Sequence, residues 1–290
     1  MIQVRSDIPH EILAEKYAQP PSQFVTIGNQ KVHMRDEGEG PTILLVHGAG
    51  ASLHTWEGIV SELADSFRII TYDLPGFGLT GPQAEGNYSI GRHIQLVDAI
   101  VDSLGVDNFV IGGSSMGGLI AWRYAVDNQK RIDGLILIDA VGYPEGEWPY
   151  IFGFARLPAV SLIFKSMLPR WYVRRALKRA YGKNSKVTKA IVTRYCELNR
   201  HEGNRSAGME IMSGVMEDHT DKIKDIEIPA LILWGKKDKI INIKNAEKFA
   251  AELPESISVV YDEAGHIPME ESPELTAIDM REFLIGLYRE

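Results

Sequence analysis

Residues 109–118 read Phe-Val-Ile-Gly-Gly-Ser-Ser-Met-Gly-Gly, and this stretch gives the strongest indication of the fold. A short apolar run of strand type is followed by glycines and then by a helical pattern over residues 116–128. The pattern G-x-S-x-G, formed by Gly113, Ser115 and Gly117, therefore lies between an expected strand and an expected helix. Such a turn exposes the serine hydroxyl, and its glycines let backbone segments pass without Cβ clashes. A glycine-rich turn with a purely structural use is the alternative interpretation.

Short β-branched runs alternate with longer helical patterns on both sides of this stretch. Several runs are apolar on both faces, as expected for central strands of a parallel sheet that is covered by helices. The alternation predicts an α/β fold, with a mostly parallel central sheet flanked by helices. The expected strands are two antiparallel strands within 24–34, then 42–46, 68–72, 108–111, 134–138, 230–234 and 256–261, and the expected helices are 53–66, 89–104, 116–128, 243–253 and 273–289.

One long segment interrupts the alternation. Residues 143–215 are mostly helical in pattern and contain no convincing strand, and they are too many for a loop. We therefore predict a helical cap over 143–215, inserted into an α/β core domain made of 1–142 and 216–290. The segment holds 13 Lys and Arg against 5 Asp and Glu, a surplus of +8, whereas the remainder holds 18 against 34.

The composition of the 290-residue chain narrows the class of protein. Its net charge of −8 argues against nucleic-acid binding, and the single Cys196 excludes an internal disulfide and a cysteine-rich zinc module. Apolar runs are too short for a membrane span, and residues 1–19 contain no apolar signal core. Metal-binding spacing such as H-E-x-x-H is absent. We expect a soluble cytoplasmic protein without a metal or cofactor, and no oligomeric state is predicted.

Candidate partners for Ser115 follow other expected strands, because ligands bind beyond the carboxyl ends of strands in an open α/β sheet. His266 follows the last strand and is the candidate general base, since a serine hydroxyl is a weak nucleophile until a base takes its proton. Asp238 follows the penultimate strand and is the preferred acid for orienting that histidine. Asp139, at the end of the strand 134–138, is the rival acid.

The loop His47-Gly48-Ala49-Gly50 after the first parallel strand can present backbone N–H groups. A tetrahedral intermediate needs donors for its negatively charged oxygen, and the N–H groups of Ala49 and Met116 are the candidates for this oxyanion hole. The same loop, with Asp73 at the end of the next strand, imitates a dinucleotide site. Leu53 occupies the position of the third glycine in G-x-G-x-x-G, however, so we interpret Asp73 as a turn residue.

These motifs, in this order, resemble the α/β-hydrolase fold family and specifically its capped members, from about Phe24 to Leu287. The resemblance implies that Ser115, Asp238 and His266 form the nucleophile, acid and base of a catalytic triad. The overall likeness is to bacterial carboxylesterases and lipase-like esterases, which implies cleavage of carboxylic esters of apolar acyl groups through an acyl-enzyme. The stretches that carry the resemblance are residues 47–50, 73–78, 113–118, 234–238 and 265–271.

Other reactions occur on this fold, since fold does not fix function. Haloalkane dehalogenases and epoxide hydrolases use an aspartate where this chain has Ser115. Carbon–carbon hydrolases of ring-fission products use serine, but commonly carry asparagine before it and tryptophan after the histidine, where this chain has Ser114 and Ile267. They remain an alternative. A further alternative, from a different class, is a receptor-like protein of this fold that binds a small ligand and turns it over slowly.

The predicted cap suggests two kinds of partner. Large apolar residues in 150–154, 162–164 and 167–168 favour a small apolar ester as substrate, although they could equally pack the cap on the core. Residues 171–183 predict a short amphipathic helix that could lie on an anionic membrane or steer an acidic substrate. A solvated outer face of the cap is the favoured alternative. Val173, Leu177, Ala180 and Tyr181 form the apolar face of this helix, and Arg174, Arg175, Lys178 and Arg179 supply its charge.

Overall fold

A single sheet forms the centre of the molecule in the computed structural model, which describes residues 6–143, 168–183, 186–214 and 217–289. Within these residues the strands are ordered β1-β2-β4-β3-β5-β6-β7-β8. β2 pairs antiparallel with β1 and β4, and the remaining pairs are parallel, so the predicted α/β class is confirmed. The strands are β1 (Gln23–Ile27), β2 (Gln30–Glu37), β3 (Thr42–Val46), β4 (Arg68–Tyr72), β5 (Phe109–Ser114), β6 (Ile132–Ile138), β7 (Ala230–Gly235) and β8 (Ser256–Tyr261).

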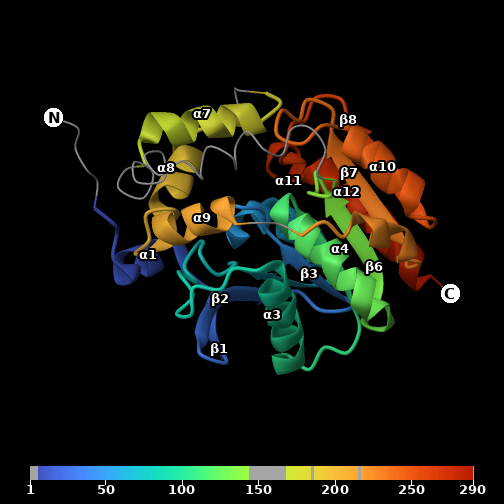
Figure 1. Cartoon of the computed structure of the whole chain (residues 1–290), viewed down its shortest axis with the longest axis horizontal. Helices are drawn as coiled ribbons and strands as arrows, with labels where there is room; N and C mark the ends of the chain where they lie inside the picture. Colours follow the sequence, from blue (N-terminus) through green and yellow to red (C-terminus); the bar gives the residue numbers. More distant parts are fainter. Residues whose placement is uncertain (1–5, 144–167, 184–185, 215–216, 290) are drawn as a thin grey trace.

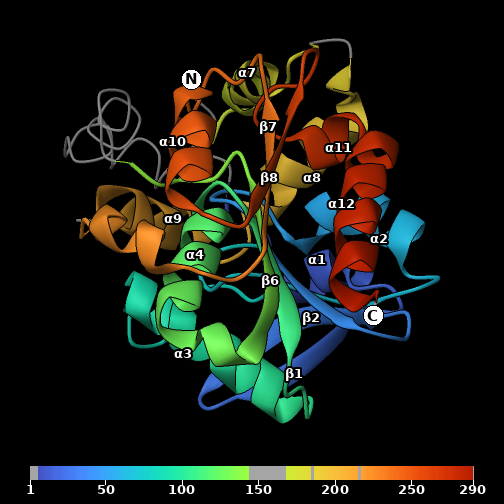
Figure 2. The same ribbon diagram turned by 90° about the vertical axis from the view of Figure 1, so that its right-hand side faces the viewer.

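Helices cover both faces of the sheet (Figure 2). Successive side chains of a strand point to opposite faces, so β3 buries Leu44 and Val46 on the side of α3, α4 and α10, and Ile43 and Leu45 on the side of α2 and α12. This explains why the central strands are apolar at nearly every position. The helices are α1 (His10–Tyr17), α2 (Glu57–Leu63), α3 (Ile90–Ser103), α4 (Met116–Asn128), α7 (Arg170–Ala180), α8 (Lys189–Leu198), α9 (Asn204–Ser213), α10 (Lys244–Glu252), α11 (Pro268–Glu271) and α12 (Pro273–Tyr288).

Two local expectations differ from the structure. The helix α1 was not predicted, because only Leu13 of its side chains is fully buried while Ile12 is 59% exposed, so its apolar pattern is weak. The helix expected over 53–66 divides into a 3-10 turn, η1 (Leu53–Trp56), followed by α2.

The helices α7, α8 and α9 lie between β6 and β7 in the chain, within the segment predicted as a cap (Figure 1). Asn199, directly after α8, donates to the carbonyl of Gly50 in the loop after β3 at 2.7 Å, so the end of α8 contacts the edge at which the parallel strands end. The apolar runs at 150–154 and 162–164 lie outside the described residues, and the cap boundaries stay a prediction. In the part of the chain that the structure describes, no helix is long and apolar enough to cross a bilayer.

Candidate active site

Ser115 occupies a strained turn between β5 and α4. Its φ is +55° and its ψ is −117°, a backbone conformation that L residues rarely adopt. The turn is held from both sides, because Ser115 N–H donates to the carbonyl of Ile138 at 3.1 Å and its own carbonyl accepts from Val141 N–H at 3.0 Å. The surrounding structure therefore imposes this backbone conformation, and Ser115 is half-buried in it.

The two flanking glycines of G-x-S-x-G are required by close packing. A Cβ on Gly117 would lie 2.0 Å from the carbonyl oxygen of Val46 in β3, and one on Gly113 would lie 2.2 Å from the backbone of Gly117. Neither position can accept a side chain without moving β3 or α4. The sequence pattern thus reflects the place where strand β5 turns into helix α4.

The loop after β3 lies against the candidate nucleophile. A Cβ on Gly48 would be 3.0 Å from the Cβ of Ser115 and 3.7 Å from its Oγ. The next N–H belongs to Ala49, and among the described residues it has no hydrogen-bond acceptor. Met116 begins α4, and the first N–H groups of a helix lack an intrahelical acceptor. Both predicted oxyanion donors are therefore beside Ser115.

His47 fixes the direction of one of these donors, a role that the sequence interpretation missed. Its Nε2 accepts from Leu74 N–H at 2.9 Å, so the proton is on Nδ1, which donates to the carbonyl of Gly48 at 2.7 Å. In a trans peptide the C=O and N–H point in opposite directions, so Ala49 N–H is turned away from the imidazole. Burial lowers the pKa of His47 and keeps the ring neutral. A buried histidine directly after a strand was the available signal.

His266 and Asp238 are brought together as predicted. His266 Nδ1 lies 2.7 Å from Asp238 Oδ2, and the Asp238 side chain is fully buried. The other oxygen, Oδ1, accepts from the N–H groups of Ile240 at 2.6 Å and Ile241 at 3.1 Å. One carboxylate oxygen is thus held by backbone while the other orients the imidazole, which leaves His266 Nε2 available to a nucleophile.

Asp139 belongs to the same cluster but does not bond His266. Its Oδ1 accepts from Gly235 N–H at 3.0 Å, its Oδ2 has no partner among the described residues, and its φ is +43°. One metal-ligating atom each of Asp139, Asp238 and His266 lies within 4.8 Å of the others, so the three could hold a cation. His266 and Asp238, however, already form a hydrogen bond with each other. Burial and the nearby Asp238 raise the pKa of Asp139 well above its usual range.

The loop that carries His266 is tied to the end of α7. His266 N–H donates to the carbonyl of Ala180 at 2.6 Å, and Gly265 N–H donates to Glu271 Oε1 at 2.6 Å. Glu271 is buried, which raises its pKa, and its Oε2 accepts from Gly182 N–H at 2.8 Å. Glu271 therefore connects the chain after α7 to the loop that carries His266. In the sequence it is one of two adjacent glutamates, Glu270 and Glu271, and nothing there indicated this role.

The Ser115 hydroxyl makes no hydrogen bond to His266 or to any other described residue. The backbone of Ser115, however, is linked to the acid–histidine cluster. Its N–H donates to Ile138, directly before Asp139, and its carbonyl accepts from Val141, two residues after Asp139. Catalytic hydrogen bonds are often long before substrate binds, so this geometry suits a candidate nucleophile and base.

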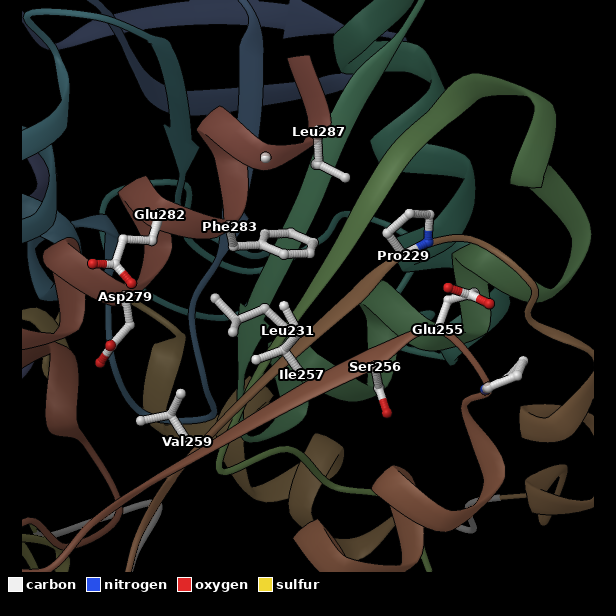
Figure 3. Close-up of a pocket in the computed structure, with 12 residues that line it drawn as sticks. Pro229, Leu231, Glu255, Ser256, Ile257, Val259, Asp279, Glu282, Phe283 and Leu287 are labelled. Carbon is white, nitrogen blue, oxygen red and sulfur yellow. The ribbon is translucent and has the colours of Figure 1, made fainter. Parts of the chain in front are cut away.

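A surface groove of about 620 Å³ lies elsewhere, at the amino ends of β7 and β8 and beside α12 (Figure 3). Leu231, Ile257 and Phe283 are among its apolar lining, and Asp279 and Glu282 supply carboxylates. It contains no histidine or cysteine. The groove is therefore at the opposite end of the parallel strands from Ser115 and does not belong to the candidate site.

Comparison with known proteins agrees with this geometry. Residues 41–273 match the family described as alpha/beta hydrolase fold. The chain belongs to the α/β-hydrolase family. The resemblance inferred from the motifs is thereby confirmed, and the protein is a member of a family of hydrolases.

Members with different reactions are similar to this hydrolase. Lipase 3 of Moraxella sp. is 26% identical over 273 residues, covering 90% of this chain and 82% of the relative. Haloalkane dehalogenase 2 of Mycobacterium tuberculosis is also 26% identical, over 266 residues, covering 88% and 92%. The solved structure of a thermophilic esterase from Thermogutta terrifontis is 27% identical, with a TM-score of 0.80, and covers 92% of this chain and 99% of that one. Meta-cleavage product hydrolases share the fold.

Proposed function

We propose that this hydrolase cleaves carboxylic esters of apolar acyl groups through an acyl-enzyme on Ser115. The observation that carries the proposal is the strained turn at Ser115, with the Gly48 loop against it and the His266–Asp238 pair at the same edge of the sheet. A hydroxyl, a base and backbone donors are the parts that acyl transfer requires.

The proposed reaction has two halves. His266 Nε2 takes the Ser115 proton as Oγ attacks the ester carbonyl carbon, and the oxygen that becomes negative accepts from Ala49 and Met116 N–H. The C–O bond to the alcohol then breaks, and His266 returns the proton to that leaving group. Water attacks the acyl-enzyme by the same route and releases the acid, while Asp238 stabilises the imidazolium in both halves.

Ester cleavage is preferred to the other reactions of the family on the residues of this chain. Dehalogenases use an aspartate nucleophile, and a hydroxyl at Ser115 suits acyl transfer instead. Carbon–carbon hydrolases commonly carry asparagine and tryptophan at the positions of Ser114 and Ile267. The esterase and Lipase 3 among the similar proteins support the same choice.

A substrate panel and a covalent label test the proposal together. We expect repeated turnover of p-nitrophenyl esters, changing with acyl length, and little cleavage of a ring-fission dienoate. An organophosphate should add to Ser115, as located by peptide mass spectrometry. Faster cleavage of the dienoate would establish the carbon–carbon alternative, and slow turnover of every ester would favour the receptor-like one. A rate that stays flat between about pH 5 and 8 would contradict a histidine base.

A further inference from the structure

The helix α7 has an unusual outer face. It contains five basic residues and no acidic one, and Arg174, Arg175 and Arg179 are exposed. Val173 and Leu177 are buried on the inner face, which confirms the predicted amphipathic pattern. Figure 1 shows the helix on the outside of the molecule, along its upper margin. The outer face therefore looks away from the protein.

Two aromatic residues extend this face at the start of α7. Trp171 is 68% exposed and Tyr172 is 36% exposed, and their rings are in edge contact with centroids 6.1 Å apart. The other tryptophans of the described residues, Trp56, Trp122 and Trp234, are fully buried. Exposed Trp and Tyr beside basic residues are typical of segments at the membrane–water interface, where an amphipathic ring has both an apolar and a wet side.

The basic residues of the outer face lack acidic partners, in contrast with others of the inserted segment. Lys183 pairs with Glu263 at 3.1 Å, Arg194 with Glu270 at 3.2 Å and Arg205 with Asp7 at 2.7 Å. Within the described residues, Arg174, Arg175, Lys178 and Arg179 form no such pair, and Arg179 donates only to the carbonyl of Lys239. Their charge is thus available to an external anionic surface.

The net charge of the chain favours one orientation of the protein on an anionic surface, with α7 toward that surface. The net charge is −8, and an anionic surface repels most of the molecule. Screening limits these forces to about 8 Å at physiological salt, so a local basic face can bind while the acidic core, held farther away, contributes little. Contact through α7 would also place the candidate site near the lipid, because Ala180 at the end of α7 accepts from His266 N–H.

We propose that α7 docks this protein on anionic lipid bilayers, with Trp171 and Tyr172 at the headgroup level and the four basic residues against the headgroups. Amphipathic helices with a basic polar face lie in the interface in this way. The docking itself does not depend on the reaction. The docking also implies that the bilayer supplies the apolar ester, and this implication alone rests on the proposed function.

Vesicle binding tests the docking directly with the full-length protein. We compare vesicles of phosphatidylcholine and phosphatidylserine with vesicles of phosphatidylcholine alone, by co-sedimentation across a range of salt. The test variant combines Arg174→Gln, Arg175→Gln, Lys178→Gln and Arg179→Gln. The matched control removes the same charge from the core by Lys130→Gln, Lys222→Gln, Lys224→Gln and Lys244→Gln, four exposed positions.

Binding of the wild type to the anionic vesicles should be salt-dependent. The α7 variant should bind at least about a hundredfold more weakly, since each basic group near an anionic surface contributes about fivefold. The core variant should bind nearly as well as the wild type. A separate Trp171→Ala variant should weaken the binding that persists at high salt.

Several results would overturn the docking. They are no binding of the wild type to anionic vesicles, equal losses in the α7 and core variants, or an α7 variant that binds normally but has a raised KM for a soluble anionic ester. The last result would assign the basic face to substrate steering. All variants should hydrolyse a small neutral soluble ester at the wild-type rate, which shows that they are folded. Vesicle binding without any ester hydrolysis would leave the docking intact and contradict the proposed function alone.

Discussion

The described residues include two buried histidine–aspartate pairs with the same geometry and different surroundings. His266 Nδ1 lies 2.7 Å from Asp238, and His33 Nδ1 lies 2.7 Å from Asp73. The second pair even has a serine in hydrogen-bond contact, because His33 Nε2 lies 3.0 Å from the Oγ of Ser22. By hydrogen bonds alone, it is the more complete Ser–His–Asp set of the two.

The environment of the second set gives it a structural role. Asp73 accepts from Leu53 N–H and from Leu79 N–H, each at 2.7 Å, so it joins the start of η1 to the turn after β4. Burial opposes its ionisation, but His33, with smaller effects of His47 and His54, still holds the pKa of Asp73 below its usual range. Ser22 has no positive φ, whereas Ser115 and Asp139 are the only non-glycine residues of the described chain that do. The strained turn and the free N–H groups beside Ser115, rather than the Ser–His–Asp hydrogen bonds, are therefore what separates the two sets and what makes Ser115 the proposed nucleophile.

The largest expected difference between the two sets follows from removing each serine in turn. Ser115→Ala should lower turnover of a p-nitrophenyl ester by about 10⁴-fold or more, because the nucleophile acts as a unit with its base. Ser22→Ala should change it by no more than about twofold. The rates are measured on purified proteins of equal fold, judged by circular dichroism. Loss of activity in the Ser22 variant with retention in the Ser115 variant would reverse the assignment of the two sets.

The acids can be compared in the same way. Asp238→Asn should cost about 10⁴-fold in kcat. The amide oxygen would keep the N–H groups of Ile240 and Ile241, so the NH2 group would face His266 Nδ1, favour the wrong tautomer and supply no negative charge to stabilise the imidazolium. Asp139→Asn should cost about tenfold or less, because its side-chain oxygen can still accept from Gly235 N–H. Both are measured with one soluble ester at neutral pH. A dead Asp139 variant beside an active Asp238 variant would make Asp139 the third member.

The sequence was sufficient for the sheet and for the meeting of His266 with Asp238, because both depend on patterns that repeat along the chain. Apolar runs at strand spacing predicted the central strands, and position after a strand predicted which side chains would share an edge. The roles of His47 and Glu271 could not be predicted in this way. Each acts through a backbone group of another segment, and no local pattern specifies which carbonyl or N–H will be within reach. The same reason concealed the second set around His33.

Another buried histidine, His93, tests how much a hydrogen-bond partner contributes to stability. His93 has no hydrogen bond at either nitrogen among the described residues, and burial, with a smaller effect of His47, lowers its pKa from 6.5 to about 4. As pH falls from 6.5 the unfolded chain takes up this proton first, so the free energy of unfolding should fall progressively until about pH 4. The loss from His93 alone is about 3 kcal/mol.

His93→Leu should flatten this pH dependence, as measured by urea unfolding between about pH 7 and pH 4. Part of the slope should persist, because burial also lowers the pKa of His54 to about 4 and adds to the loss in the same window. Asp73 affects stability at lower pH than these histidines. Its pKa is depressed in the folded protein, so the stability that it contributes is lost only as the pH falls below the usual pKa of an aspartate. An unchanged slope in the variant would mean that His93 is solvated or paired in solution.

The smallest expected effect concerns the sign of a stability change at the two serines. Ser22→Ala leaves His33 Nε2 and Arg35 Nε, which donates to Ser22 at 2.9 Å, without their shared partner, and should lower the free energy of unfolding by about 1 kcal/mol. Ser115→Gly should raise it by about 1 kcal/mol, because relief of a strained φ exceeds the added entropy of the unfolded chain. Urea midpoints at constant m-value measure both. Opposite signs would show that Ser22 stabilises the fold whereas Ser115 is present at a cost in stability. A destabilised Ser115→Gly variant would mean that the turn at Ser115 stores no strain.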